Sequence, residues 1–189
     1  MVEIRLARAE DLEAIAALVN VYVLEGYSHL GTTPLSIEDV RGLALNPMHA
    51  CFVACEDGEV LGAAWSAKHK TREAYDWTVD LAVYLRASAQ GRRVGGRLQA
   101  RVVECLRSQG YVSALAVIVM PNPASVALHE GLGFERVGVM PNMGFKLGQW
   151  RDVGVWHLRL ITPSSPPPRP RPVAEVLEDR SRSGNASTS

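Results

Sequence analysis

The chain has 189 residues, and its 20 lysine and arginine residues are balanced by 20 aspartate and glutamate residues. This length is typical of one domain with a substantial buried core. The zero net charge excludes a bulk positive field that would attract nucleic acid or an anionic membrane, so any anion site must be local.

The N-terminus and the cysteines indicate the compartment. Residues 1–20 lack the basic and apolar regions of a signal peptide, and nowhere do eighteen apolar residues run without charge. We therefore expect a soluble, cytoplasmic protein. Cys51, Cys55 and Cys105 lack CxxC spacing and a neighbouring histidine cluster, which favours reduced core thiols over a disulfide frame or a zinc site.

The first half of the chain alternates between the two periods of regular structure. Apolar residues at alternate positions in 2–7 predict a strand, and apolar residues at helical spacing in 8–26 predict a helix. A loop at 27–36 leads to a second helix. Residues 51–69 then predict two strands joined at Asp57-Gly58, a strong hairpin signal.

The second half predicts a further strand at 75–85 and a helix that closes at Gly110. The apolar run 112–120 suits a strand that is buried on both faces. A short helix in 122–134 and strands at 135–140 and 153–160 complete the order β-α-α-β-β-β-α-β-α-β-β. The sequence thus predicts a single α+β domain over residues 1–161, with a mixed, mostly antiparallel central sheet.

Residues 162–189 differ in composition from the rest of the chain. They are rich in proline, serine and charge, and their apolar surface is too small to offset the entropy of ordering. We expect a largely disordered tail. Its PPPRPRP stretch admits a second interpretation, a polyproline ligand for a partner domain.

The turn QGRRVGG, Gln90–Gly96, joins a predicted strand to a predicted helix. Exposed amides and the helix dipole at such a turn can hold an anion, and small residues let the anion approach. A structural corner of the same composition is the alternative, because the dinucleotide-binding pattern GxGxxG is absent.

The turn does not stand alone. A buried strand follows its helix, and NPASVALHEGLGF follows that strand. This combination resembles the GCN5-related N-acetyltransferases (GNAT), whose pyrophosphate loop reads Gln/Arg-x-x-Gly-x-Gly/Ala. Gln90 to Gly95 match it except that Arg93 replaces the first glycine. Residues 74–85, 116–134 and 144–160 look like the phosphinothricin acetyltransferase branch of that superfamily.

The resemblance implies acetyl-CoA as donor and the primary amine of a small amino acid as acceptor, such as phosphinothricin, methionine sulfone or methionine sulfoximine. It also implies a homodimer, with residues 140–150 near the interface. Two alternatives are a relative that binds acyl-CoA without turnover, which Arg93 and the altered loop SHLGTTP favour, and a protein N-terminal acetylase, which AYDWTV and GFKLGQW disfavour.

The resemblance also implies the site residues. Asp80, where close relatives carry glutamate, and His129 are the acid–base candidates, and either could be the base. The other interpretations are that Asp80 pairs with a cation such as Arg72 and that His129 only orients a ligand. The cofactor would contact Leu81, Ala82, Val83, Tyr84, Leu85, Gln90, Gly91, Arg92, Arg93, Val94, Gly95, Gly96, Asn122 and Ser125.

For Arg93 we favour a negative φ, which would keep its amide in the loop and let its guanidinium reach a CoA phosphate. The alternative is a positive φ, which would cost an arginine on the order of 1 kcal/mol or more. Asn122 and Ser125 could also serve only as a helix N-cap. The acceptor's charged groups would be held by residues that could otherwise be surface cations or core aromatics: Lys70, Arg72, Tyr75, Trp77, Lys146 and Trp150.

Overall fold

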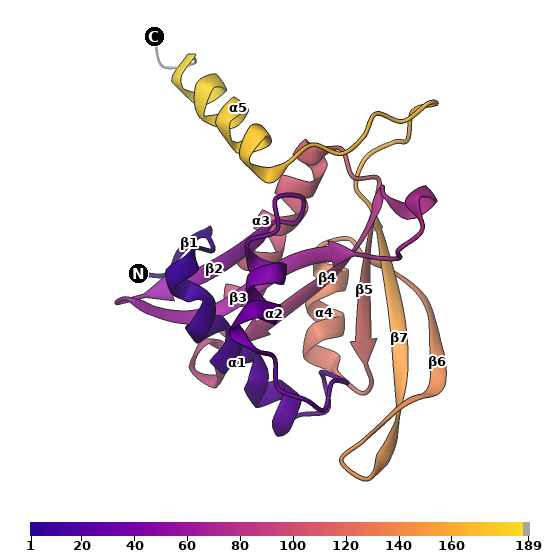
Figure 1. Cartoon of the computed structure of the whole chain (residues 1–189). Coiled ribbons are helices and arrows are strands. Elements are labelled where there is room, and N and C mark those ends of the chain that lie inside the picture. The colour runs from indigo at the N-terminus through magenta and orange to yellow at the C-terminus, as the bar shows by residue number, and fades with distance from the viewer. Residues whose placement is uncertain (187–189) are drawn as a thin grey trace.

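The computed structural model describes residues 1–186, and its elements follow the predicted order (Figure 1). Their bounds are β1 Glu3–Leu6, α1 Leu12–Leu24, α2 Ile37–Ala44, β2 Cys51–Glu56, β3 Glu59–Lys68, β4 Thr78–Leu85, α3 Val94–Gln109, β5 Ser113–Val119, α4 Pro123–Gly131, β6 Glu135–Lys146, β7 Gln149–Arg159 and α5 Val173–Ala186. Helix α5 has no counterpart in the prediction.

The strands of this part of the chain form one seven-stranded sheet in the order β1-β2-β3-β4-β5-β7-β6. Only β4 and β5 pair in parallel, because α3 crosses over between them. All other neighbouring pairs are antiparallel. The predicted α+β class with a mixed, mostly antiparallel sheet is therefore confirmed.

Local sequence signals set several element boundaries. Helix α3 ends at Gly110, whose φ of 91° lies in the left-handed region that glycine adopts without strain. Helix α2 begins with a capping box between Ser36 and Asp39. Asn122 caps α4 by accepting a hydrogen bond from the amide of Ser125 at 3.1 Å.

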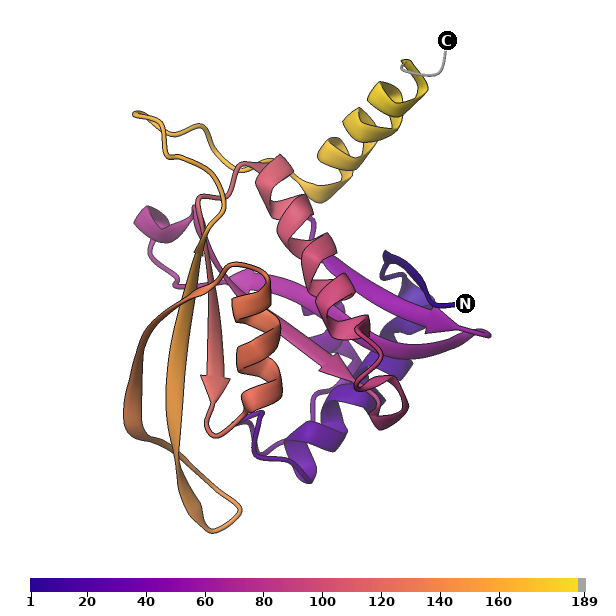
Figure 2. The ribbon, with the colours of Figure 1, turned by 180° about the vertical axis from the view of Figure 1, so that it is seen from behind.

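Two hydrophobic clusters cover the two faces of the sheet. Helices α1 and α2 pack over β2 to β4 on one face, where Val53, Ala63 and Trp65 are buried. Helices α3 and α4 pack on the other face, around Leu98, Phe134 and Trp156. Figures 1 and 2 show that α1 and α2 do not extend over β5, β7 and β6, so this half of their face carries no helix.

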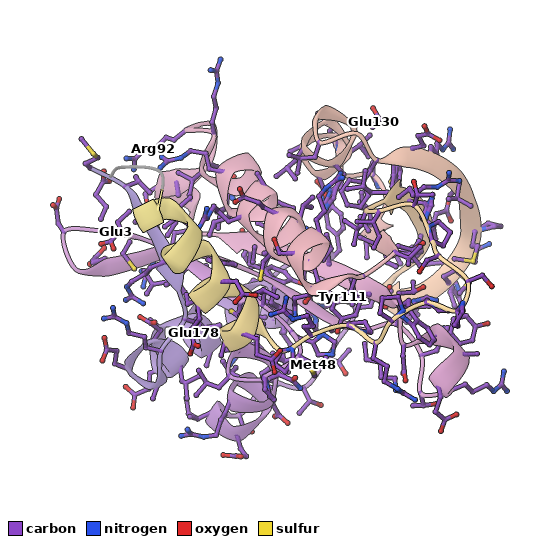
Figure 3. The ribbon with its side chains drawn as sticks, turned by 90° about the horizontal axis from the view of Figure 1, so that it is seen from above. Glu3, Met48, Arg92, Tyr111, Glu130 and Glu178 are labelled. Carbon is purple, nitrogen blue, oxygen red and sulfur yellow. The ribbon has the colours of Figure 1, made fainter. Side chains whose placement is uncertain are left out.

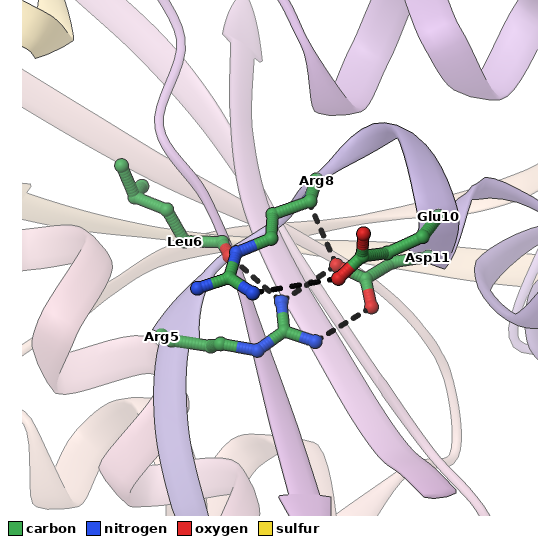
Figure 4. A network of polar contacts seen from close by, with 5 residues as sticks. All are labelled: Arg5, Leu6, Arg8, Glu10 and Asp11. Carbon is green, nitrogen blue, oxygen red and sulfur yellow. Dashed lines mark hydrogen bonds and ion pairs between the residues drawn. The ribbon is translucent and has the colours of Figure 1, made fainter. Parts of the chain in front are cut away.

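A partly buried ion pair fixes the start of α1 against β1 (Figure 4). Arg5 donates two hydrogen bonds to the Asp11 carboxylate, at 2.7 and 2.8 Å, and the amide of Arg8 donates a third at 2.7 Å. The hydrogen bond from Arg5 holds the pKa of Asp11 below its usual range, although burial opposes this shift. Stability that depends on this carboxylate is therefore lost only as the pH falls through its lowered pKa.

The C-terminal segment packs on the domain within the described residues, where the sequence predicts a largely disordered tail. Val173 and Val176 of α5 are buried in the α3 cluster. The Trp77 indole donates to the carbonyl of Pro168 at 2.6 Å, and the amide of Arg171 donates to the carbonyl of Gln109 at 2.8 Å. These valines use the apolar surface of α3 and so do not need a core of their own.

Figure 3 looks down on α5 and shows Met48 and Tyr111 beside its first turns. The side-chain amide of Gln109 donates to the carbonyls of Met48 at 3.0 Å and Arg171 at 2.8 Å, so it bridges two loops. Residues 187–189 of the predicted tail lie outside the described residues. Among residues 1–186, no helix has the length and apolar character needed to span a membrane.

Candidate active site

The two parallel strands in the middle of the sheet separate along their length. Pairing between β4 and β5 is confined to residues 78–81 and 113–116. Beyond Leu81, β4 continues along β3 as far as the pair of Leu85 with Gly62, whereas β5 continues along β7 as far as the pair of Val119 with Val153. The strands thus form a wedge, which we define by residues 82–85 and 117–119. The backbone groups that face each other across it have no strand partner among residues 1–186.

The loop that leaves the wedge leads directly into the N-terminus of α3. A short 3-10 helix, Ala87–Ala89, is followed by Gln90 and Gly91, and α3 starts at Val94. A Cβ at Gly96 would meet no atom within 4 Å, so the first turn of α3 is open to a ligand. The orphan amides and the dipole at the start of a helix favour an anion, so the anion site at this turn stays a prediction.

Gly95 has a different role from Gly96. A Cβ at Gly95 would lie 2.9 Å from Leu128 Cδ1 and 3.2 Å from Leu85 Cδ1. The absence of a side chain there lets α3 pack closely against α4 and the end of β4. Gly95 therefore serves helix packing, and the close approach of a ligand would depend on Gly96.

Arg93 does not have the expected negative φ. Its φ is 60° and its ψ is 12°, in the left-handed region that costs a non-glycine residue roughly 1–2 kcal/mol. The prediction of a negative φ is wrong because the chain must reverse between Gly91 and the first turn of α3, and Arg93 occupies the position where a glycine would relieve this strain.

We expect Arg93→Gly to raise the free energy of unfolding by about 1 kcal/mol at most, because relief of strain is partly offset by glycine's larger unfolded-state entropy. Acetyl-CoA binding should stay equal or weaken slightly, since the loop amides remain. Thermal unfolding would measure the change in stability, and calorimetry would measure the change in acetyl-CoA affinity.

Arg92→Gly is the matched control and should lower stability, because Arg92 lacks a positive φ and pairs with Glu56 at 2.8 Å. A large gain in affinity would mean that the Arg93 side chain obstructs the loop.

A cleft of about 650 Å³ lies between α1 and residues 85–90, beside the mouth of the wedge. The Tyr22 hydroxyl donates to the carbonyl of Leu85 and accepts from Gln90 Nε2 at 3.4 Å. Leu85 and Gln90 are both predicted cofactor residues. The wall that α1 contributes was missed, because no signal in the sequence relates residues 17–26 to the loop.

Asp80 lies in the paired part of β4, at the base of the wedge. Its carboxylate accepts a hydrogen bond from His69 Nδ1 at 2.8 Å, and the partner is therefore His69 where the sequence suggested Arg72. Burial raises the pKa of Asp80, although the bond to His69 partly offsets this. A carboxylate with a raised pKa in a partly open position is suited to proton transfer.

His129 lies on α4 and is almost completely buried. Its Nδ1 donates to the carbonyl of Ser125 at 2.8 Å, because that oxygen can only accept. In the described part of the chain its Nε2 has no hydrogen-bond partner. Burial lowers the pKa of this imidazole, so the neutral form with a free lone pair on Nε2 is favoured.

Asp80 and His129 lie on opposite faces of the sheet. Leu81 and Val83 pack on the α3 and α4 side, whereas Ala82 and Tyr84 pack on the α1 and α2 side. By strand alternation Asp80 shares the face of Ala82. His129, whose ring lies edge-on to Phe134 at 5.1 Å, belongs to the other face. The two residues can therefore take part in one reaction only if the reacting groups lie in the wedge, with Asp80 on one side of them and His129 on the other.

The predicted acceptor residues do not form one cluster. Lys70, Arg72 and Tyr75 are exposed on the segment between β3 and β4, close in sequence to the His69–Asp80 contact. The indole of Trp77 donates to Pro168 instead. Trp150 is 62% exposed and lies edge-on to Phe145 at the end of the β6–β7 hairpin.

Lys146 is buried, and its ammonium is used within the protein. Its Nζ donates to the carbonyls of Tyr22, Val23 and His29, at 3.2, 2.7 and 2.5 Å. The prediction that it binds the acceptor is therefore corrected, because an ammonium has three donors and all of them are taken. Lys146 caps the C-terminus of α1 and holds the loop that follows.

That loop, residues 25–35, is tied to several other elements. Asn20 of α1 exchanges two hydrogen bonds with the backbone of Leu35, at 2.8 and 3.0 Å. The Tyr27 hydroxyl donates to the carbonyl of Pro121 at 2.9 Å, and the Arg151 guanidinium lies over the Tyr27 ring. The loop therefore reaches from α1 to the segment that precedes α4, across the open end of the wedge.

Comparison with known proteins places this geometry in a family. A sequence model of the acetyltransferase (GNAT) family matches residues 12–134. The chain is 37% identical over 180 residues to a phosphinothricin N-acetyltransferase of Streptomyces viridochromogenes, covering 93% of this chain and 96% of that protein. It is 34% identical to an L-methionine sulfoximine/L-methionine sulfone acetyltransferase of Pseudomonas aeruginosa, covering 87% and 98%.

The fold agrees with the same relatives. The crystal structure of a phosphinothricin acetyltransferase from Sinorhizobium meliloti in complex with AcCoA matches with a TM-score of 0.81 and 30% identity, covering 88% of this chain and 95% of that one. Both the sequence and the architecture thus agree with the resemblance seen in the motifs.

Proposed function

Because the chain belongs to the acetyltransferase (GNAT) family, we propose that it transfers the acetyl group of acetyl-CoA to the primary amine of a small amino acid. L-Phosphinothricin, L-methionine sulfoximine and L-methionine sulfone are the proposed acceptors, because proteins of similar sequence are named for them. The observation that carries the proposal is the wedge between β4 and β5, which opens onto the N-terminus of α3.

The residues present fit the proposed donor. Residues 82–85 offer backbone groups without a strand partner on the side of β5, which suits the amide-bearing arm of acetyl-CoA. The amides of residues 91–96 and the exposed Arg93 suit its pyrophosphate. A main-chain amide near Leu81 to Val83 would polarise the thioester oxygen, as in an oxyanion hole.

Acid–base assistance is assigned to Asp80 and His129. An ammonium cannot attack a thioester, so the acceptor must lose a proton on the Asp80 side before it attacks. His129 lies on α4, and its Nε2 has no hydrogen-bond partner in the described part of the chain. In the proposed mechanism this nitrogen accepts a second proton from the acceptor nitrogen and passes it to the departing sulfur. The amine attacks the thioester directly, with no covalent enzyme intermediate.

The deciding experiment measures free-thiol release from acetyl-CoA with a panel of the three proposed acceptors and the ordinary amino acids. N-Acetyl-L-methionine sulfone, which lacks a primary amine, is the matched blank. Background from the protein should be small, because burial raises the pKa of Cys51 to about 12 and also raises that of the partly buried Cys55, and Cys105 is buried. Fast release with one proposed acceptor, with the acetylated product found by mass spectrometry, supports the proposal. Binding of acetyl-CoA without release to any amine would favour a non-catalytic relative.

We also propose that two copies associate through the β6–β7 hairpin. Its exposed apolar side chains include Met143, Phe145, Leu147 and Trp150, each more than half exposed. Such a contiguous apolar surface is unusual for a monomer and is typical of an interface. The family resemblance independently implies a homodimer.

We expect the double variant Phe145→Ser, Trp150→Ser to sediment as a monomer at micromolar concentration where the wild type sediments as a dimer. Leu24→Ser, which removes an apolar side chain of similar exposure from α1, is the control and should leave the sedimentation coefficient unchanged. A wild-type protein that is already monomeric in analytical ultracentrifugation would contradict the proposal.

A further inference from the structure

His69 is a histidine that no motif in the sequence singles out. Its Nδ1 lies 2.8 Å from Asp80 Oδ1, and its ring packs edge-on against the ring of Tyr75 with centroids 5.8 Å apart. It is only 18% exposed. Within the described residues its Nε2 has no protein partner, so one ring nitrogen is held and the other is free.

The strand register explains how His69 reaches Asp80. Ala67 of β3 pairs directly with Asp80 of β4. Because side chains alternate along a strand, the residue two positions after Ala67 returns to the same face and becomes the diagonal neighbour of Asp80. The short 3-10 helix Glu73–Tyr75 then folds back, and Tyr75 holds the other side of the ring.

We propose that His69 is the catalytic base of the acetyl transfer, with Asp80 as the residue that orients and stabilises it. This inference rests on the proposed function and refines the role of Asp80 within it. Aspartate is one methylene shorter than the glutamate of close relatives, and an imidazole hydrogen-bonded to it extends the reach of the pair from the strand. The pair has the arrangement of a histidine base oriented by a carboxylate.

The proton balance of the step is complete. The acceptor ammonium gives one proton to His69 Nε2, and Asp80 stabilises the resulting imidazolium. The neutral amine forms the new C–N bond with the thioester carbon, and the C–S bond breaks. The second proton leaves the nitrogen for the sulfur, through His129 in the proposed function. The products are the amide and free CoA thiol, and His69 returns its proton to solvent.

The charges around His69 are compatible with this role. Lys70 is its neighbour in the chain, and Lys68 is neutralised by Asp76 at 2.9 Å. Across the sheet, Asp80 pairs with Leu115, which pairs with His157. His157 is thus about 10 Å from Asp80, two strands away on the same face, and contacts Ser113 at 3.2 Å. On the side of the 3-10 helix, Arg72 and Glu73 are exposed.

The test compares wild type with His69→Asn, whose side-chain amide can still donate to Asp80 but has no base at the position of Nε2. We expect kcat/KM for the acceptor identified by the panel to fall roughly a hundredfold or more, with KM for acetyl-CoA unchanged. His69→Ala should lose activity similarly and regain part of it with added imidazole. His157→Asn is the matched control and should retain wild-type kinetics.

A second measurement does not need turnover. In ¹⁵N spectra of the histidine-labelled wild type, His69 should appear as the Nδ1–H tautomer, and Asp80→Asn should change its signals. The Nε2–H tautomer would overturn the proposal, as would wild-type kcat/KM in His69→Asn or loss of activity in His69→Ala without imidazole rescue. A wild type that acetylates no amine would refute the proposed function, and the tautomer would still decide whether His69 is built as a base.

Discussion

Exchange of Asp80 for asparagine is expected to lower kcat by roughly a hundred- to ten-thousandfold and to leave the affinity for acetyl-CoA nearly unchanged. Asparagine keeps the volume of the side chain but cannot carry the negative charge that accepts, or stabilises, the proton from the acceptor. Acetyl-CoA contacts the backbone of β4 and the α3 loop in the proposed site, and these remain. Steady-state kinetics and calorimetric binding would separate the two effects.

The stability of this variant should move in the opposite direction to its activity. Burial raises the pKa of Asp80 in the folded state, so this carboxyl binds its proton more tightly in the folded protein than in the unfolded chain. Its contribution to stability is present below the unfolded-state pKa and is lost as the pH rises through the raised folded-state pKa. At neutral pH, Asp80→Asn should therefore unfold at a temperature equal to or higher than that of the wild type.

Asp76→Asn is the matched control for Asp80→Asn. Asp76 lies just before β4 and pairs with Lys68 and Arg169 on the surface. The Asp76→Asn enzyme should retain most of the wild-type turnover, because ion pairs near the surface contribute little to stability. An Asp80→Asn enzyme with wild-type kcat would remove Asp80 from the mechanism, whereas equal losses in both variants would point to a general effect of charge in this segment.

A chain that ends at Ile161 is expected to unfold roughly 10 °C below the full-length protein. The truncation removes Val173 and Val176, which are 7% and 2% exposed and together contribute about 4 kcal/mol by burial. It also leaves the Trp77 indole and the Gln109 amide without their partners at Pro168 and Arg171. For a domain of this size, 1 kcal/mol corresponds to about 2–4 °C in Tm.

A chain that ends at Asp179 is the control for this truncation, because it keeps Val173, Val176 and the contacts of Pro168 and Arg171. Its Tm should match that of the full-length protein. In the full-length chain, Val173→Ser combined with Val176→Ser should reproduce most of the loss. If the chain ending at Ile161 melts at the full-length temperature, the segment does not dock, and the original expectation of a largely disordered tail would hold.

Much of the fold around the candidate site could be predicted because its parts are local in sequence. The strand-to-helix turn Gln90–Gly96, the Asn122 cap of α4 and the Asp57-Gly58 hairpin each depend on neighbouring residues, whose turn and capping preferences act within a few positions. Asp80 also stood out, because a carboxylate in an apolar strand is costly without a reason. These features match the structure at the residues where they were expected.

The errors concern contacts between residues far apart in sequence. Lys146 was taken for a substrate contact, and its true partners are the carbonyls of Tyr22, Val23 and His29. His69 was overlooked, because the β3–β4 register that places it beside Asp80 is set by the pairing of Ala67 with Asp80. This register depends on the length of the connection between β3 and β4, which residue composition alone does not give.

The sequence by itself determined the order of the elements up to β7, the mixed sheet, the strand-to-helix turn and the carboxylate in β4, because periodicity and local propensity act over short ranges. Tertiary structure decided the rest. It opened the wedge, because β4 follows β3 while β5 follows β7. It also gave Arg93 a positive φ, turned Lys146 inward and docked Val173 and Val176 on α3. Each outcome depends on partners that only packing brings together, and packing free energy overrides the preference of a single residue or segment.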